Sequence, residues 1–561
     1  MPKRINILSF LIVSLLIVLT VAVQSSFQHW SAMYDLDFIY IYNASIMSSG
    51  IQQEWYDHPA TTILSLYSIF YKIYSLFDYS FIYKINEIKE ASDPNLVLQK
   101  LYFVTRIFDS INVILIVLFT FKISKILSTK DIHAYFLTLT LIVSGHFLNN
   151  LSLLNPEDWA VCFFLISFYY LLNFFIKKNI ILIILSGLFF LFAFLSKINI
   201  LFLFFFIILL IPIFHEMYSI KSNSPIQTSL EKNFTLLFGS YLAILLLYFV
   251  IQIFVLGKLD PFVKNAGLDA FIIITINFIY MSFFLIISKF NLAKFKTYFS
   301  IFILFLSGFV LGLIIFLSLD ILNIAKLNPL ILVHLVKPFY KMLNFAYAPE
   351  GMAAPMLGPA LLESSVTIIN EILLIISKVF SNFHFDNFLF IGLCLIFVIS
   401  TFKDLKNKNT YSFLFKLIIF FSLVFNILLF NFRWWLEYNT SVHVLYVILL
   451  SVCFKDLSNK IVKSFCIISI TYVLVFLPIK NSSLYLVDGR IPGTEHNTWK
   501  SILSTRPSQL VALCNNFYPG NQPPDNYFIF ERYSKQFDAD TFSKICNLPK
   551  SRFRGDRYVL E

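Results

Sequence analysis

The residues best placed to do chemistry are two aspartates that follow the first apolar run of the chain. Asp35 and Asp37 lie in residues 34–59, about one helical turn beyond the expected membrane boundary. A carboxylate beside a membrane costs free energy unless water solvates it, and a carboxylate kept there often has a function. The functional interpretation is a general base that takes the proton from an acceptor hydroxyl as this hydroxyl attacks a sugar carbon. The alternative is that both carboxylates only solvate the start of a helix.

The same stretch closes with Asp57-His58-Pro59. Pro59 suits the first position of a helix, and His58 either binds a phosphate or the acceptor, or only caps that helix. Arg106 and Asp109 follow in the next apolar segment, spaced i and i+3, so they share a helix face and can pair. Either this pair holds its helix to a neighbour, or Arg106 points at an anionic group.

Two further outer turns carry charges. Asn155-Pro156 is typical of a turn. The turn does not explain why two acids, Glu157 and Asp158, follow at the start of an apolar helix, although a helix N-terminus favours acidic side chains. Lys197 is a lone basic residue between two very apolar segments. It either binds the phosphate of a lipid or snorkels to the membrane surface.

Basic residues also occur in the expected second outer loop. His334, Lys337 and Lys341 are spaced i, i+3 and i+7 on one helix face. They suit a phosphate or diphosphate, or an anionic lipid head group.

Arg433 precedes two tryptophans of the kind found at membrane interfaces, and its guanidinium suits a two-point contact with phosphate.

The composition indicates the scaffold that must position these residues. The chain has 561 residues, 58% of them hydrophobic and only 13% charged, whereas soluble proteins have roughly 45–50% and 25%. This predicts an all-α polytopic membrane protein. The net charge is +11, but the basic residues sit in short loops, which indicates topology rather than nucleic-acid binding. None of the six cysteines has metal-binding spacing.

The hydrophobic pattern predicts about thirteen transmembrane helices. Residues 58–77 are excluded, because Tyr67, Tyr71, Lys72 and Tyr74 interrupt them, and they are expected to form an amphipathic helix in the outer interface. The first run is expected to be an uncleaved anchor, with a secretory signal as the alternative. The expected spans are 5–23, 101–126, 133–152, 157–176, 179–195, 197–215, 234–256, 268–288, 298–320, 387–402, 412–430, 440–455 and 462–479.

With this count, every strongly basic short loop falls on one side of the membrane, which predicts that this side is cytoplasmic. The N-terminus is then cytoplasmic and the C-terminus extracytoplasmic, in the cell (inner) membrane. The expected outer regions are residues 24–100, 321–386 and the tail. Residues 1–480 would form the membrane module and 481–561 a C-terminal extracytoplasmic domain, in which Cys514 and Cys546 either pair or stay free thiols.

Taken in order, these motifs resemble the GT-C fold of polytopic glycosyltransferases. The first motifs are an aspartate loop with a glycine some fifteen residues on, and His-Pro before an interfacial helix. An arginine early in the next span and an acid at the next outer turn follow. The last motif is a lysine after Gly-Leu-Phe-Phe-Leu-Phe-Ala-Phe-Leu-Ser. The likeness is to the protein-mannosyltransferase-like and lipid A aminoarabinose transferase-like branch. It covers roughly residues 1–215 and is topological beyond them.

The resemblance implies a polyprenyl-phosphate sugar donor, transfer on the outer face of the membrane, and inversion at the sugar carbon. Asp35 matches the catalytic acid of the first loop, and His58-Pro59 matches its proline-containing motif. Arg106 matches the arginine of the second span, Glu157 or Asp158 the later acid, and Lys197 a lysine that contacts lipid phosphate in some members.

This chain departs from the family at two places. Asp-Leu-Asp replaces the common Asp-Glu pair, so Asp37 shares or takes the role of Asp35, and a divalent metal is permitted but not required. Asp57-His58 replaces a lysine or tyrosine before Pro-Pro, which leaves the phosphate ligand open.

The sequence therefore predicts an inverting glycosyltransferase that acts on a glycan, lipid or protein acceptor. A transporter or flippase for lipid-linked glycans and a non-catalytic scaffold are the alternatives. Transport would call for polar residues deep in several spans, whereas the expected spans have nearly uncharged centres.

Overall fold

A computed structural model defines the fold for most of the membrane module. The described residues are 2–27, 37–53, 60–142, 154, 156–197, 200–218, 233–258, 266–327, 387–430, 440–455, 457, parts of 460–468, and two pairs near the C-terminus. Nearly all of them are helical. The exceptions are short turns and two strands, β1 (Phe553–Arg554) and β2 (Arg557–Tyr558), which pair antiparallel with Phe553 opposite Tyr558.

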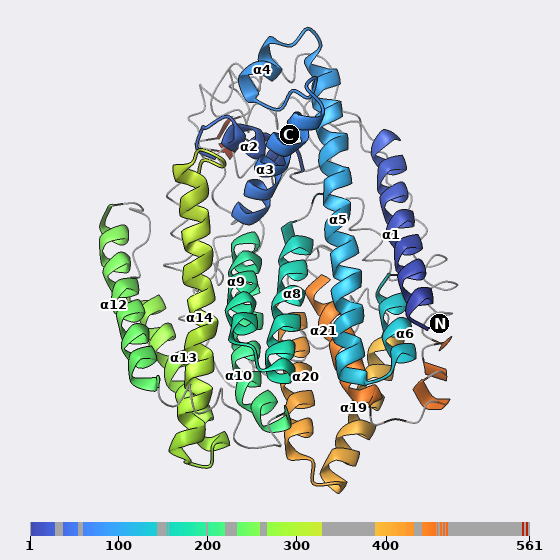
Figure 1. Ribbon diagram of the computed structural model, residues 1–561, viewed down its shortest axis with the longest axis vertical. Helices are drawn as coiled ribbons and strands as arrows, with labels where there is room; N and C mark the ends of the chain where they lie inside the picture. The colour runs from blue at the N-terminus through green and yellow to red at the C-terminus, as the bar shows by residue number, and fades with distance from the viewer. Residues whose placement is uncertain are drawn as a thin grey trace.

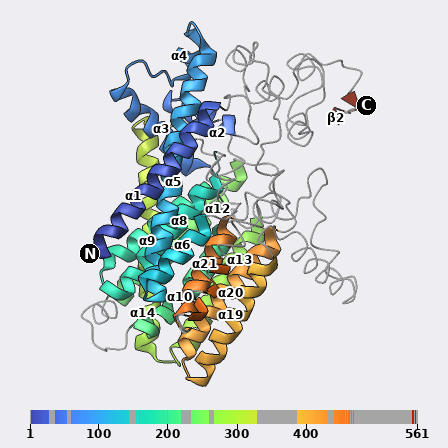
Figure 2. The same cartoon turned by 90° about the vertical axis from the view of Figure 1, so that its right-hand side faces the viewer.

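Most of the helices lie side by side along the long axis of the molecule (Figures 1 and 2). These are α1 (Pro2–Phe27), α5 (Pro94–Ser128), α6 (Asp131–Ile142), α8 (Pro156–Lys177), α9 (Ile180–Ser196), α10 (Leu201–Tyr218), α12 (Phe234–Lys258), α13 (Ala266–Ile287), α14 (Leu292–Ile321), α19 (Asn387–Lys406), α20 (Thr410–Phe430) and α21 (Thr440–Phe454).

Three short helices gather at one end of this bundle, which we call the α3 end (Figure 1). They are α2 (Asp37–Ser48), α3 (Thr61–Phe77) and α4 (Ile85–Glu90). The opposite end is called the basic end, because α5, α8 and α19 reach it with Lys125, Lys177 and Lys406 in their last turns.

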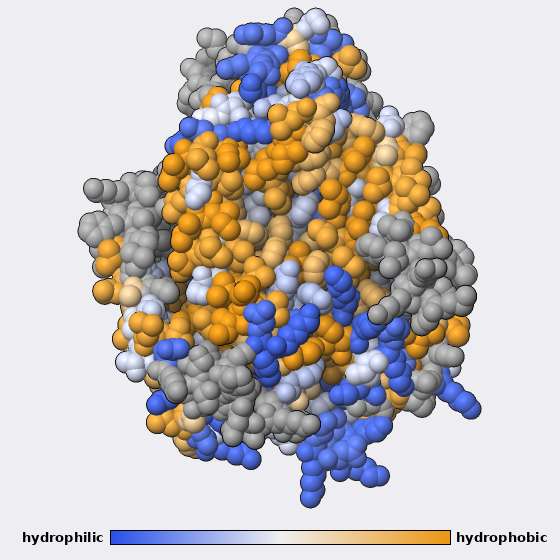
Figure 3. Space-filling model, viewed as in Figure 1, coloured by the Kyte–Doolittle hydropathy of each residue, from blue (hydrophilic) through white to orange (hydrophobic). Residues whose placement is uncertain are grey.

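The surface and the helix lengths are those of a helical membrane protein. Hydrophobic side chains cover the middle of the face seen in Figure 3, and hydrophilic ones gather at its two ends. Leu96–Ser128, Pro156–Lys177 and Leu292–Ile321 are long and apolar enough to cross a membrane, and several shorter apolar helices accompany them. The all-helical membrane scaffold is thus confirmed for the described residues, while the count of thirteen spans stays a prediction.

The segment that the sequence excluded from the spans crosses the end of the bundle. The Thr62 hydroxyl donates to the carbonyl of Phe192 on α9 at 3.0 Å, and the Ser68 hydroxyl donates to the carbonyl of Ile324, just beyond α14, at 3.0 Å. The first residues of α3 are buried, but Leu76 and Phe77 are exposed.

Helices α8, α9 and α14 pack closely through small residues. The hydroxyls of Ser167 on α8 and Ser186 on α9 each donate to the carbonyl of the other residue, at 2.7 and 2.8 Å. A Cβ on Gly187 of α9 would meet the Phe305 carbonyl of α14, and one on Gly308 would meet the carbonyl of Ile184 at 2.1 Å. Small residues allow this approach where helices associate in lipid.

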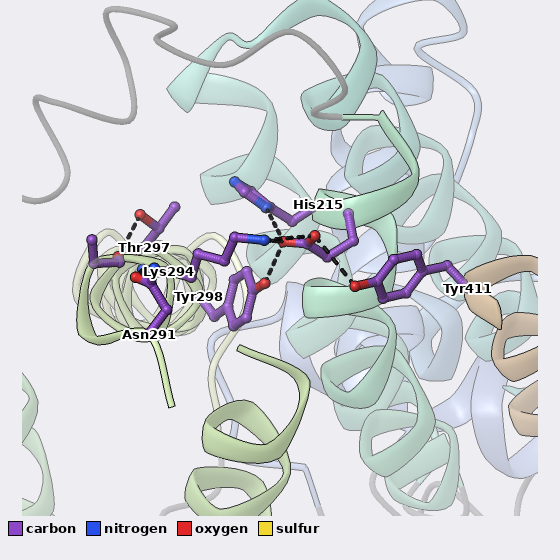
Figure 4. A network of polar contacts seen from close by, with 8 residues as sticks. His215, Asn291, Lys294, Thr297, Tyr298 and Tyr411 are labelled. Atoms are coloured by element: carbon purple, nitrogen blue, oxygen red, sulfur yellow. Dashed lines mark hydrogen bonds and ion pairs between the residues drawn. The ribbon is translucent and has the colours of Figure 1, made fainter. Parts of the chain in front are cut away.

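The basic end is tied by a polar network around Glu216 of α10 (Figure 4). Its carboxylate accepts from Lys294 Nζ at 2.8 and 2.9 Å and from the Tyr298 hydroxyl at 2.6 Å, both on α14. Tyr411 of α20 donates at 3.4 Å, and His215 Nδ1 lies 3.5 Å away. The network joins three helices far from the α3 end.

We predict that Gly308→Ala lowers the melting temperature, because the new methyl group would overlap a backbone carbonyl of α9, and overpacking costs about 1–3 kcal/mol. The matched control is Gly239→Ala on α12, where a Cβ meets nothing within 4 Å. Unfolding followed by fluorescence in detergent checks both variants, and equal melting temperatures for the two would contradict the packing.

Candidate functional site

Five charged side chains are buried near the α3 end of the bundle, and we call them the buried charge cluster. Arg106 and Asp109 come from α5, Glu157 and Asp158 from α8, and Lys197 from the end of α9. None of them is more than 5% exposed. Charged residues are almost never buried to this extent unless they are paired, so this end of the bundle differs in chemistry from its apolar middle.

Local sequence places these charges at helix ends that suit them. Pro156 opens α8, so Glu157 and Asp158 lie in its first turn, where the helix dipole favours acids. Lys197 is the C-cap of α9, in an extended conformation, with its backbone N–H bonded to the Ala193 carbonyl. A cation is favoured at this end. Acid and base therefore meet where the start of α8 lies beside the end of α9.

Glu157 and Lys197 form a salt bridge between Oε1 and Nζ. Both side chains are about 95% inaccessible to solvent, so the pair is shielded from water and salt. The sequence predicted both residues as substrate-binding but did not predict that they pair. In this structure, the Lys197 ammonium contacts a carboxylate of the protein.

Asp109 joins three helices through one oxygen. Its Oδ1 accepts from the Tyr67 hydroxyl of α3 at 2.8 Å and from Trp159 Nε1 of α8 at 2.6 Å. Burial raises the pKa of Tyr67 well above its usual range, and the charge of Asp109 raises it further, so Tyr67 stays a neutral donor. Beside it, the Tyr71 and Thr105 hydroxyls lie 2.7 Å apart.

Sequence reasoning missed Tyr67 and Trp159 as members of this site. Tyr67 served only as a reason to keep residues 58–77 out of the membrane, and Trp159 was not considered. The residue type alone could have indicated a hydrogen-bonding role in both cases. Each is an aromatic residue with a polar hydrogen, and such residues find a partner when they are buried.

The structure buries four of the predicted residues near the α3 end, pairs two of them, Glu157 and Lys197, and leaves the others untested. Arg106, Glu157, Asp158 and Lys197 all belong to the buried charge cluster. Asp35, His58, His334, Lys337 and Arg433 lie outside the described residues, and Asp37 begins α2 without a described side chain.

Described residues that border the undescribed segments lie at the α3 end. Ala60 is fully buried and directly precedes α3. Lys326 donates its backbone N–H to the carbonyl of Met47 on α2 at 3.3 Å, and Leu327 donates to Asp320 Oδ1 at 2.9 Å. The chain thus enters the segment of His334 and Lys337, and leaves the one of His58, at this end.

The described residues contain no group of three metal-ligating side chains. Asp109 Oδ1 accepts two hydrogen bonds, and Glu157 Oε1 pairs with the Lys197 ammonium. A divalent ion held by Asp35 and Asp37 stays a prediction. Cys162, Cys394 and Cys453 are free thiols, the first and last fully buried, while Cys514 and Cys546 lie outside the described residues.

Comparisons with family models, with curated proteins and with solved structures find no match for this chain. The likeness to GT-C glycosyltransferases therefore depends on the sequence motifs alone.

We predict that Lys197→Met destabilises the protein by about 3–5 kcal/mol, because it leaves the Glu157 carboxylate buried without its partner. The double variant Glu157→Leu/Lys197→Met removes both charges and should regain most of this loss. Chemical unfolding in detergent measures both. A single variant as stable as the wild type would contradict the buried pair.

Proposed function

We propose that the protein is an inverting glycosyltransferase that moves a sugar from a polyprenyl-phosphate donor to an acceptor hydroxyl. The observation that supports this best is the buried charge cluster at one end of an apolar bundle, under the helix α3. The segments that carry Asp35 and His58 border the described residues of α2 and α3 at that end. A lipid-linked donor would reach such a site from the membrane.

The proposed reaction uses the first-loop carboxylates. Asp35, with Asp37 sharing the role, accepts the proton of the acceptor hydroxyl. The hydroxyl oxygen attacks C1 of the sugar from the face opposite the phosphate. The C1–O bond to the phosphate breaks, its electron pair stays on the phosphate oxygen, and the configuration at C1 inverts.

The departing polyprenyl phosphate carries negative charge that cations must stabilise. Arg433 and Lys337 are proposed to contact it, with His58 and His334 as further ligands. Lys197 contributes from a shielded position, where fixed charges act more strongly than in water. Because Glu157 already holds Lys197, the phosphate would share this ammonium rather than meet a free one.

The proposed orientation puts the α3 end on the outer face of the cell (inner) membrane. Lys125, Lys177 and Lys406 at the opposite end then face the cytoplasm, as the positive-inside rule favours. The N-terminus is cytoplasmic and the C-terminus extracytoplasmic in this proposal. The partners are the lipid-linked sugar, membrane lipid, and a glycan, lipid or protein acceptor.

We predict that Asp35→Asn or Asp37→Asn lowers sugar transfer by about 10²–10⁴-fold, because loss of a general base has effects of that size. Transfer from polyprenyl-phosphate sugars to acceptor is measured in proteoliposomes, and the anomer of the product is read by NMR. The control is Asp93→Asn at the N-cap of α5, since asparagine caps a helix as well as aspartate does.

A flippase or a scaffold would be indifferent to both substitutions. Unchanged transfer by Asp35→Asn and Asp37→Asn would contradict the proposed mechanism, and so would a product that retains the donor configuration.

A further inference from the structure

One face of α3 carries a row of polar side chains. Thr61, Ser65, Ser68 and Lys72 lie within about 60° of one another around the helix, at 3.6 residues per turn. The C-terminal half of this row is occupied, because Ser68 donates to the Ile324 carbonyl at 3.0 Å and Lys72 to the Asn323 carbonyl at 2.7 Å.

The N-terminal half of the row is different. The hydroxyls of Thr61 and Ser65 are buried, at 1% and 2% exposure, and in the described structure neither makes a hydrogen bond. Ser45, on the neighbouring α2, has a third hydroxyl in the same condition. Buried hydroxyls are normally satisfied, and each one left without a partner costs about 1–3 kcal/mol.

Several other buried hydroxyls of this bundle are satisfied within their own helix, whereas those of Thr120 on α5 and Ser422 on α20 also lack a hydrogen bond in the described structure. Thr105, Thr138 and Ser451 each donate to the carbonyl four residues back, at 2.7 to 2.8 Å. Thr61 opens its helix and has no helical carbonyl four residues before it. Ser65 has one available but does not bond to it. The backbone of α3 therefore satisfies neither of these two hydroxyls.

We propose that Thr61 and Ser65, with Ser45 on the neighbouring α2, form the hydrogen-bonding subsite for the sugar of the lipid-linked donor. A sugar presents several neutral hydroxyls, which pair with serine and threonine hydroxyls as donor or acceptor. The subsite lies on the helix that Tyr67 links to Asp109 and the buried charge cluster. The same helix also contacts α9, because Thr62 donates to the Phe192 carbonyl at 3.0 Å, and α9 ends at Lys197. This inference rests on the proposed function.

The test uses the full-length protein in lipid nanodiscs and the double variant Thr61→Val/Ser65→Ala. Thr61→Val keeps the side-chain shape, and Ser65→Ala removes the hydroxyl alone. Melting temperature is measured with polyprenyl phosphates that carry single hexoses or pentoses, and with polyprenyl phosphate that carries none, since a ligand stabilises the state it binds. The matched control is Ser68→Ala, which loses a hydroxyl that is already bonded.

The variant without ligand should be as stable as the wild type or more stable, because it loses no bond. Its affinity for the sugar-bearing lipid that the wild type prefers should fall about tenfold or more, while its affinity for the bare lipid stays unchanged. Ser68→Ala should show the reverse, a lower melting temperature with sugar preference retained.

If the double variant still prefers the sugar-bearing lipid as the wild type does, the subsite is wrong and the proposed function stands. If it melts as low as Ser68→Ala without ligand, the two hydroxyls have a structural role and the subsite is again wrong. If the wild type itself binds bare and sugar-bearing lipids alike, both the subsite and the proposed function are overturned.

Discussion

The α3 end of the structure depends on buried charged side chains that bond to partners on neighbouring helices. Glu157 and Lys197 pair between the start of α8 and the end of α9, and Asp109 accepts two hydrogen bonds from Tyr67 and Trp159. Removing one member of such a group leaves another buried without compensation. These contacts therefore fix where α3, α5, α8 and α9 meet.

The two ends of the bundle are connected through the same helices. Helix α14 packs on α9 through Gly187 and Gly308, supplies Lys294 and Tyr298 to the Glu216 network at the basic end, and is followed by the carbonyls that anchor α3 at the other. Small residues in the middle of the bundle and polar contacts at its ends both hold the helices together. This is expected in lipid, where apolar burial alone does not drive helix association.

Much of the scaffold follows from the sequence, because a helix in a membrane must satisfy its own backbone and so leaves a long apolar run. The exclusion of residues 58–77 also follows, since Tyr67, Tyr71 and Lys72 serve contacts across a bundle end rather than a span. The partners of individual residues do not follow. Whether Lys197 meets Glu157 or a phosphate depends on how α8 and α9 pack, and this is set by Ser167 and Ser186 in the middle of those helices.

The central claim is that a lipid-linked phosphate binds at the α3 end of the bundle. The most direct measurement is a cryo-EM structure of the full-length protein in nanodiscs with a polyprenyl-phosphate sugar. We expect head-group density beside α3, next to Lys197, with the lipid tail running along the apolar middle of the bundle. Head-group density at the basic end, near Lys294 and Glu216, would contradict it.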